Sequence, residues 1–212
     1  MIKYLYADSL YLFPKLAESM FRDRAVQFRD RLGWDVAVDA DGFERDYYDA
    51  MNPLYVIATN TDGTHAGSMR FLPTTAETMV NDHFLHLTDN VRISSPLIWE
   101  CTRFCLSPRS PDRSHEISAA LMMAGCELGL RIGLQHAVGV FDSRMLRIYH
   151  RLGWVPDILG TSDNGPDSIS VGLWAFSLRA LETVARKAGI APADAAQWFD
   201  ASFPISQTAL VA

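Results

Sequence analysis

The amino-acid sequence predicts an α/β sandwich that folds as a single domain over residues 1–212. Two observations carry this prediction. Segments rich in β-branched and aromatic residues, which are typical of strands, lie before and after one long stretch at residues 114–132 whose apolar positions recur at helical spacing. No Pro- or Gly-rich linker divides the chain, and its 49% hydrophobic and 21% charged content is ordinary for a protein with one packed core.

The N-terminal half alternates between strand and helix patterns. The first helical pattern ends at Gly33, and an Asp-Gly pair at Asp62 marks a turn between two strand patterns. The acidic segment between them holds few core residues, so we expect a loop there. In chain order we predict a strand at 1–7, a helix at 13–32, the loop at 35–49, paired strands at 54–59 and 65–72, short helical pieces at 74–87 and a strand at 97–106.

The C-terminal half is organised around the long helix. Ser114 is a favourable N-cap for it, and Asp142 for the helix that follows, because such side chains accept hydrogen bonds from the first free N–H groups of a helix. In chain order we predict a loop rich in Pro and Arg at 107–113, the helix at 114–132, a strand at 136–141, a helix from Asp142 to about Gly153, a strand at 168–176, and helices at 178–188 and 192–199.

Charge and composition argue against several classes of function. The net charge of −6 disfavours nucleic-acid binding, and no apolar run approaches the roughly 20 residues of a membrane helix. Asp8, close behind a short N-terminal segment, disfavours a signal peptide. Cys101, Cys105 and Cys126 lack metal-ligand spacing and indicate buried, reduced thiols. We therefore expect a cytoplasmic protein without a metal.

Two arginines stand where apolar residues are expected. Arg24 shares a helix face with Met20 and Phe28, and a guanidinium there is costly to bury unless it meets an anion, which the acidic stretch at 44–49 can supply. Arg70 lies in the middle of a strand pattern, where arginine is rarely buried without a partner. The alternatives are a structural salt bridge at Arg24 and a solvated edge strand at Arg70.

An acid and a base also interrupt the apolar strand at 97–106. Glu100 and Arg103 are three residues apart, so their side chains point to opposite faces of a regular strand. If both serve one cleft, an irregularity must lie between them, and a β-bulge is the usual device near active sites. The alternative is an ion pair at the end of a strand.

Together these positions resemble the signature of one family. Over roughly residues 1–176 the chain is similar to the acyl-homoserine lactone synthases, also called autoinducer synthases. The resemblance is carried by Arg24-x3-Phe28-x5-Trp34, by Glu44-x-Asp46-x-Tyr48-Asp49, by the run Gly67-Ser68-Met69-Arg70-Phe71-Leu72-Pro73-Thr74-Thr75, and by Trp99-Glu100-x-x-Arg103-Phe104. The matching polar and aromatic positions are Arg24, Phe28, Trp34, Asp46, Asp49, Arg70, Glu100 and Arg103.

The resemblance implies an αβα sandwich with a mixed central sheet, like that of the GNAT acyltransferases, and a reaction with two substrates. The methionyl amine of S-adenosylmethionine takes an acyl group from an acyl carrier protein or from acyl-CoA. The methionyl carboxylate then attacks its own γ-carbon and expels methylthioadenosine. The product is an acyl-homoserine lactone, a quorum-sensing signal. Because S-adenosylmethionine is consumed as a substrate, no cofactor is expected.

The chemistry of the residues fits such a reaction. A free α-amine has a pKa of about 7.7–8.0, and Glu100 is the best base to accept its proton, directly or through water. Arg70 or Arg24 can bind the substrate carboxylate bidentately. Arg103 can orient Glu100 or stabilise charge on the thioester oxygen. We therefore predict Glu100, Arg103 and Arg70 as catalytic residues.

The site predicted for S-adenosylmethionine combines charges with rings. Asp46 and Asp49 suit the sulfonium and ammonium groups, and the ring of Trp34 or Phe28 can cover the adenine or the sulfonium. The full predicted set for this substrate is Arg24, Phe28, Trp34, Asp46, Asp49, Arg70, Arg103 and Phe104.

We predict an acyl pocket lined from the central helix and the strand after it, because methionines make an adaptable apolar lining. Plain core packing is the alternative for each residue. Family members that prefer a 3-oxo chain often carry a threonine in the strand matching 136–141, which has no hydroxyl residue here, and this argues against a 3-oxo product. The predicted lining is Met122, Met123, Cys126, Val138, Val140, Met145 and Leu173.

Basic residues recur on the helix that begins at Asp142. Arg144, Arg147 and Arg151 are spaced by three and four residues and therefore share one face. An acidic carrier protein would be attracted to such a stripe, so we predict that the carrier docks there. A solvated helix face is the alternative.

The main alternative function is a conventional GNAT N-acyltransferase that uses acyl-CoA on another amine. Such enzymes hold CoA phosphates on a Gly-rich turn before a helix, whereas residues 107–114 contain Pro108 and Pro111 and no glycine. This difference also slightly favours a carrier-protein donor. A non-catalytic ligand-binding module is a second alternative, and the presence of Glu100 argues against it.

Overall fold

The computed structural model describes residues 1–163, 165 and 168–203. Its strands are β1 (Ile2–Tyr6), β2 (Leu54–Thr59), β3 (His65–Pro73), β4 (Ile98–Leu106), β5 (His136–Asp142), β6 (Asp157–Thr161) and β7 (Ile169–Ala175). Its α-helices are α1 (Pro14–Ala25), α2 (Met79–His83), α3 (Ser114–Arg131), α4 (Leu146–Leu152), α5 (Leu178–Ala188) and α6 (Pro192–Ser202). Shorter segments are η1 (Ala7–Leu12), the π-helical η2 (Val26–Arg31), η3 (Tyr47–Met51), η4 (Leu85–Leu87), η5 (Pro111–Arg113) and η6 (Ser143–Met145).

The strands form one mixed sheet in the order β1-β2-β3-β4-β5-β7-β6. Neighbouring strands are antiparallel except β4 and β5, which are parallel. The parallel pairing is short, because it joins Ile98–Glu100 to His136–Val138 while β4 runs on to Leu106. The two central strands therefore part just beyond Glu100.

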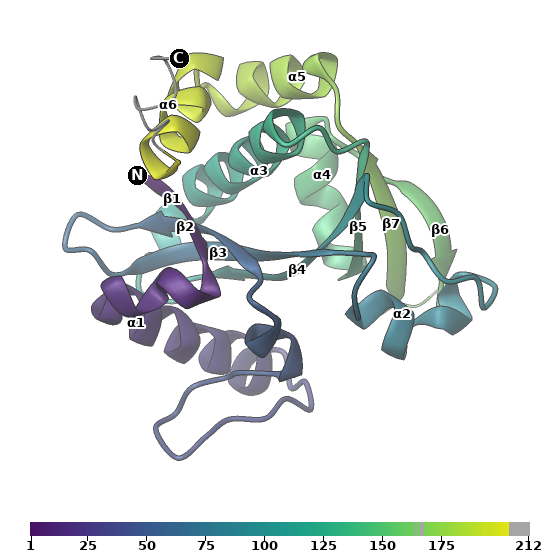
Figure 1. The fold of residues 1–212 in the computed structure, drawn as a ribbon, viewed down its shortest axis with the longest axis horizontal. Coiled ribbons are helices and arrows are strands. Elements are labelled where there is room, and N and C mark those ends of the chain that lie inside the picture. The colour runs from purple at the N-terminus through teal and green to yellow at the C-terminus, as the bar shows by residue number, and fades with distance from the viewer. Residues whose placement is uncertain (164, 166–167, 204–212) are drawn as a thin grey trace, which may run out of the picture.

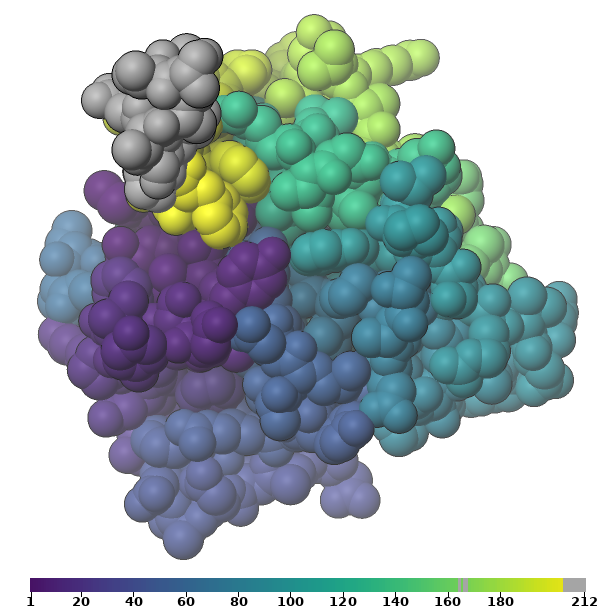
Figure 2. All heavy atoms as spheres, in the orientation of Figure 1, coloured from purple at the N-terminus to yellow at the C-terminus, as the bar shows by residue number. Residues whose placement is uncertain are grey.

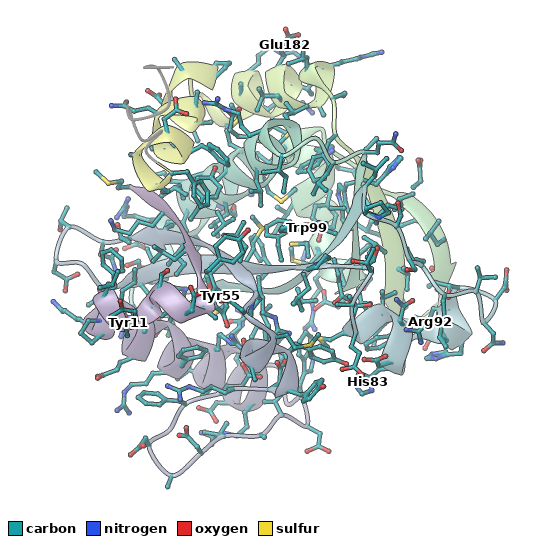
Figure 3. The ribbon with its side chains drawn as sticks, in the orientation of Figure 1. Tyr11, Tyr55, His83, Arg92, Trp99 and Glu182 are labelled. Carbon is teal, nitrogen blue, oxygen red and sulfur yellow. The ribbon has the colours of Figure 1, made fainter. Side chains whose placement is uncertain are left out.

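Helices cover both faces of the sheet (Figure 1). α1 and α2 lie on one side, and α3, α4, α5 and α6 lie on the other. Successive residues of β2 point to opposite layers, so that Tyr55 packs with α1 whereas Val56 packs with α3. Figure 3 shows the same division, with Tyr55 on the α1 side of the sheet and Trp99 on the α3 side. The predicted αβα sandwich with a mixed sheet is confirmed.

The last helix packs against the first strand. The Tyr4 hydroxyl donates to the carbonyl of Ala124 at 3.0 Å, and its ring meets Phe199 edge-on with 5.3 Å between centroids. The backbone N–H of Tyr4 also donates to Ser202. Figure 2 shows α6 in yellow directly against the purple N-terminal segment. Residues from both ends of the described chain thus share one core with α3.

Most predicted elements are confirmed, and the differences are local. The helix predicted at 13–32 is α-helical only to Ala25 and then widens into the π-helix η2. The segment expected as a loop at 35–49 contains the start of η3. The sequence does not predict the edge strand β6. Its first three residues are all exposed, so the strand lacks the period-two pattern of a half-buried strand.

One predicted cap is wrong and the other is confirmed. Ser114 does not cap α3, because η5 winds directly into the helix and Ser114 already has helical dihedral angles. Asp142 does act as a cap, since its carboxylate accepts from the backbone N–H of Arg144 at 2.9 Å. Within the described residues, no helix is both long and apolar enough to cross a bilayer.

Candidate active site

Arg24 of α1 is buried completely and is held by carboxylates. Its side chain is 1% exposed. Nε donates to Glu44 at 2.6 Å, and the two terminal nitrogens donate to the two oxygens of Asp49 at 3.0 and 2.9 Å. The prediction that the acidic stretch supplies an anion for this arginine is confirmed. Since each of its three nitrogens already meets a carboxylate, Arg24 is poorly placed to clamp a substrate as well.

Arg70 of β3 is also fully buried, and it lies inside the sheet rather than on an edge. Its terminal nitrogens donate to Asp46 at 2.5 and 3.0 Å, and one of them also donates to Asp49 at 2.8 Å. Nε donates to the Thr102 hydroxyl at 3.0 Å. The alternative of a solvated edge arginine is therefore wrong.

Arg103 reaches the same place through a bulge in β4. The register between β3 and β4 shifts between Ser68 and Arg70, and Arg103 has a φ of 52°, in the left-handed region that side chains rarely adopt. Its guanidinium contacts Glu44 at 3.0 Å and Asp46 at 2.7 Å. The predicted irregularity between Glu100 and Arg103 is confirmed, because both side chains lie on the α1–α2 side of the sheet.

These groups form a buried ion-pair cluster of three guanidiniums and three carboxylates: Arg24, Arg70 and Arg103 with Glu44, Asp46 and Asp49. Burial alone opposes ionisation of Asp49, but Arg24 and Arg70 outweigh it and hold the pKa of that carboxyl well below its usual range. The charges of the three arginines and the three carboxylates cancel, so the cluster is neutral as a whole. Glu44 was not predicted as a site residue, although the acidic stretch around it pointed to it.

The local sequence fixes the orientation of two of these carboxylates. Asp46 precedes η3 and accepts from the backbone N–H of Asp49, while Asp49 accepts from the N–H of Asp46 in return. This reciprocal capping box satisfies donors at the start of the turn. The Tyr55 hydroxyl donates to Asp49 as well, at 2.5 Å. Every oxygen of the pair therefore has a defined partner before any substrate binds.

Glu100 lies next to the cluster and is itself buried. Its two oxygens accept from the backbone N–H groups of Met79 and Val80 at 3.0 and 2.6 Å, so it caps the first turn of α2. Burial raises the pKa of Glu100 to about 7, against the opposing effect of those two N–H groups and of Arg70. A carboxyl poised near neutrality, at the point where β4 and β5 part, has the pKa expected of a general base.

An aromatic pair flanks the cluster. The rings of Phe28 and Trp34 stack with 5.2 Å between centroids and an interplanar angle of 7°. Phe28 is buried and the guanidinium of Arg103 lies 5.3 Å from its ring centroid, whereas Trp34 is 40% exposed. The pair thus extends from the buried charges to the surface, in the position expected for a platform beside a ligand.

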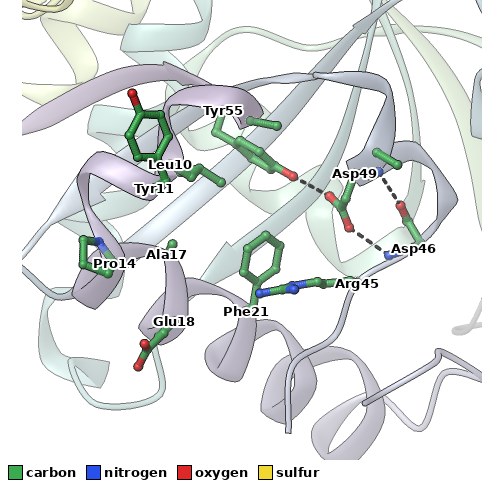
Figure 4. Close-up of a pocket in the computed structure, with 12 residues that line it drawn as sticks. Leu10, Tyr11, Pro14, Ala17, Glu18, Phe21, Arg45, Asp46, Asp49 and Tyr55 are labelled. Atoms are coloured by element: carbon green, nitrogen blue, oxygen red, sulfur yellow. Dashed lines mark hydrogen bonds between the residues drawn. The ribbon is translucent and has the colours of Figure 1, made fainter. Parts of the chain in front are cut away.

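A cavity of about 510 Å³ lies behind the cluster, between the start of α1 and η3 (Figure 4). Leu10, Tyr11 and Phe21 line it on one side, and Asp49 and Tyr55 on the other. The oxygens of Asp49 are already taken by arginines and by Tyr55, so the charged groups that remain at the wall of the cavity are Glu18 and Arg45.

The predicted residue Phe104 lies elsewhere. The bulge at Arg103 shifts the alternation of β4 by one residue. Phe104 therefore points to the opposite face of the sheet, where it packs against the hydrophobic core under α3. It contributes to the core rather than to the ion-pair cluster, so its predicted contact with S-adenosylmethionine is not supported by its position.

The predicted acyl lining lies on both faces of the sheet, and its role stays a prediction. The α3 side holds one group, packed with Trp174 and Tyr149. The α2 side holds the other, packed with Val80, whose N–H binds Glu100. The first group is Met122, Met123, Cys126 and Met145, and the second is Val138, Val140 and Leu173. The residues separate in this way because alternate side chains of a strand point to opposite faces, and only one of those faces meets α3.

The three arginines predicted for carrier docking form an exposed arginine stripe, which consists of Arg144, Arg147 and Arg151 on η6 and α4. Arg144 pairs with Asp142 at 3.1 Å, and Arg151 contacts His115 and Ser118 at the start of α3. The stripe therefore borders the loop between β4 and α3. Its role in docking stays a prediction.

The sandwich and the parting strands place the chain in the GNAT-like fold class. An acyl-CoA N-acyltransferase from Pseudomonas aeruginosa shares this fold with a TM-score of 0.53 and 14% identity, over 82% of this chain and 99% of that one. A CoA-dependent acyl-homoserine lactone synthase, BjaI, is more similar, with a TM-score of 0.79 and 26% identity over 90% of each chain.

The family follows from sequence comparison. Residues 10–172 match the model of the autoinducer synthase family. The acyl-homoserine-lactone synthase of Rhizobium etli is 42% identical over 178 residues, which are 82% of this chain and 84% of the relative. That of Agrobacterium fabrum (strain C58 / ATCC 33970) is 32% identical over 160 residues, 72% and 75% of the two chains. The chain belongs to the autoinducer synthase family and is an acyltransferase of the acyl-homoserine-lactone synthase type.

Proposed function

We propose that this enzyme transfers an acyl group to the α-amine of S-adenosylmethionine and then closes the lactone with release of methylthioadenosine. The observation that carries the proposal is the position of Glu100, a buried carboxyl with a pKa of about 7, beside the ion-pair cluster. The similar enzyme BjaI has been solved with S-adenosylmethionine and isopentyl-CoA, and also with MTA. These ligands match the substrates and the leaving group of the proposed reaction.

In the acylation step, the amine loses a proton and attacks the thioester carbonyl. Glu100 accepts this proton, because a base with a pKa near that of the amine gives the best balance of ionisation and driving force. An N–C bond forms, the C–S bond breaks, and the thiol of the donor leaves after taking a proton. The backbone N–H groups of Met79 and Val80 hold the carboxylate in place during the transfer.

In the lactonisation step, a carboxylate oxygen of the acylated intermediate attacks the γ-carbon. The O–C bond forms as the C–S⁺ bond breaks, so neutral methylthioadenosine leaves and no further base is needed. A cationic group must hold the carboxylate in the orientation needed for attack on the γ-carbon. Arg103 suits this task best, because its Nη1 meets no carboxylate in the part of the chain that the structure describes. Arg70 comes second, since its Nη2 donates to the Met79 sulfur as well as to Asp46, whereas every nitrogen of Arg24 is held by carboxylates alone.

The charge balance of the site fits a substrate that carries both signs. The ion-pair cluster is neutral as a whole, so it does not repel the sulfonium or the ammonium, while its arginine donors still attract the carboxylate. Phe28 and Trp34 offer the stacked platform for the adenine or the sulfonium. We infer that the reaction runs in the cytoplasm, because Cys101, Cys105 and Cys126 are free thiols. No added cofactor is expected, because the leaving group supplies the driving force for closure.

The acyl donor is an acyl carrier protein or acyl-CoA. The exposed arginine stripe beside the start of α3 supports an acidic carrier, because it presents positive charge near the loop after β4. The acyl chain is expected to enter where β4 and β5 part, on the side of Val138, which lies opposite Glu100 in the parallel register. The prediction against a 3-oxo chain remains untested.

The test is a product assay with two donors in parallel. Purified enzyme is incubated with S-adenosylmethionine and either an acylated carrier protein or the matching acyl-CoA, and products are identified by mass spectrometry. We expect methylthioadenosine and acyl-homoserine lactone in equal amounts. Acylation of another amine without release of methylthioadenosine would instead support a conventional N-acyltransferase.

A further inference from the structure

The thioether of Met79 occupies an unusual place beside the ion-pair cluster. Its sulfur accepts from Nη1 of Arg103 at 3.3 Å and from Nη2 of Arg70 at 3.7 Å. Two guanidiniums from neighbouring strands thus aim donors at one atom. Met79 was not singled out from the sequence, where it is one of several methionines outside any motif.

This arrangement leaves good donors with a poor acceptor. The other nitrogens of Arg103 bind Glu44 and Asp46, and Nη2 of Arg70 also meets Asp46. Nη1 of Arg103, by contrast, has only the Met79 sulfur as a hydrogen-bond partner among the residues the structure describes. A thioether is a weak acceptor, whereas a carboxylate accepts strongly from two guanidinium groups. The point filled by this sulfur is therefore where the cluster can still bind an anion.

The surroundings of this point suit the substrate carboxylate. The backbone N–H of Met79 donates to Glu100, so the sulfur and the base belong to one small region at the start of α2. Met79 is half-buried, and an unbranched methionine side chain can change rotamer at low cost. It can therefore leave the arginines when a better acceptor arrives.

We propose that the Met79 thioether occupies the arginine donors in the free enzyme and yields its place to the carboxylate of S-adenosylmethionine. This inference rests on the proposed function, because it assigns the anion to that substrate. The carboxylates of the cluster already hold the other nitrogens of Arg70 and Arg103 in place, so the substrate carboxylate meets oriented donors and displaces only two weak hydrogen bonds to the sulfur.

Two substitutions change the acceptor in opposite directions. Met79→Leu removes the sulfur at similar volume, so the carboxylate has nothing to displace and the affinity for S-adenosylmethionine should rise about threefold. Met79→Gln places an amide oxygen where the sulfur was and competes with the substrate. Its affinity for S-adenosylmethionine should fall by about tenfold.

The decisive readout compares S-adenosylmethionine with its decarboxylated analogue, by calorimetry on the wild type and both variants. The analogue cannot use the arginine donors, so its dissociation constant should hardly change. The preference for the carboxylated ligand should therefore shrink about tenfold in Met79→Gln and grow in Met79→Leu. The same preference in all three proteins, or equal weakening of both ligands, would overturn the proposal and mark Met79 as a packing residue.

A control substitution separates this effect from general methionine packing. Met69 lies next to Arg70 in β3 but packs on the opposite face of the sheet, in the core under α3. Met69→Leu should leave the ligand preference at the wild-type value. Release of methylthioadenosine by the wild type tests the proposed function separately, so an active wild type with an unchanged preference in the Met79 variants refutes only the role of Met79.

Discussion

The molecule carries two sets of three arginines that differ in almost every physical respect. Those of the ion-pair cluster are at most 7% exposed and are held by carboxylates from a separate segment of the chain. Those of the exposed arginine stripe lie at the surface and follow each other along one helix. Buried charge must be matched group by group, whereas exposed charge is satisfied by water. The arginines of the ion-pair cluster therefore have fixed positions, whereas those of the exposed arginine stripe mainly contribute a positive electrostatic potential at the surface.

The sharpest way to test this contrast is to make the same substitution in each set. Arg24→Met leaves the buried cluster with one uncompensated negative charge and should cost about 3–5 kcal/mol of unfolding free energy. Arg147→Met removes an exposed charge and should change it by no more than about 0.5 kcal/mol. Urea unfolding measures both. Similar values for the two variants would contradict the structural role of the cluster.

The proposed role of Glu100 as general base, next to the ion-pair cluster, is tested by removing its acidic group. Glu100→Gln keeps the size of the side chain and removes the base, so turnover should fall by about 10²–10⁴-fold. Circular dichroism checks that the fold survives. Turnover within about threefold of the wild type would remove Glu100 from the role of base.

Buried and exposed glutamates should also respond oppositely to pH. Because burial raises the pKa of Glu100 to about 7, the native state binds its proton more tightly than the unfolded state, and this contribution to stability is lost as pH rises toward 7. Relative to Glu100→Gln, the free energy of unfolding of the wild type should fall by on the order of 2–3 kcal/mol between about pH 4.5 and 8.

Glu116 is the exposed comparison for that measurement. Its hydrogen bond from Arg113 lowers the pKa of Glu116, so its small contribution is instead lost as pH falls. Urea unfolding at several pH values compares Glu100→Gln with Glu116→Gln. If the free energy of unfolding of the wild type rose relative to that of Glu100→Gln as the pH increased, the sign would contradict a raised pKa for Glu100.

A conservative exchange within the cluster should still be costly. Arg70→Lys keeps the charge but loses the forked contact with Asp46 and the donor aimed at the Met79 sulfur. The apparent KM for S-adenosylmethionine should rise about tenfold or more, while the KM for the acyl donor changes little. Steady-state kinetics with each substrate varied in turn gives both values. An unaltered response to S-adenosylmethionine would refute the clamp.

The smallest effect is expected on the arginine stripe. Reversing Arg147 and Arg151 to Glu should raise the apparent KM for an acylated carrier protein several-fold, with turnover at saturation nearly unchanged. The difference should shrink as salt is added, because exposed charges are screened over roughly 8–10 Å at physiological ionic strength. If KM and its salt dependence stay at wild-type values, these arginines are only a solvent-exposed helix face and do not take part in docking.

Local patterns were enough to place most elements and the signature residues. The anion partner of Arg24 and the irregularity before Arg103 could be predicted because a charge inside an apolar pattern has few physical solutions. The resemblance to the autoinducer synthases followed from the same residues and is confirmed by the family match over residues 10–172. The extent of the domain over residues 1–212 stays a prediction.

The tertiary structure decided which residues meet across the sheet. Phe104 went to the core because one bulge resets the direction of every later side chain in β4. The predicted acyl lining falls on both faces of the sheet because only one face of β5 and β7 meets α3. Glu44 and Met79 became site residues only because separate segments converge on Arg103. By itself, the sequence determined the charges that had to be paired and the family that uses them. The partner that each charge found depended on strand register and on long-range packing, which no local pattern encodes.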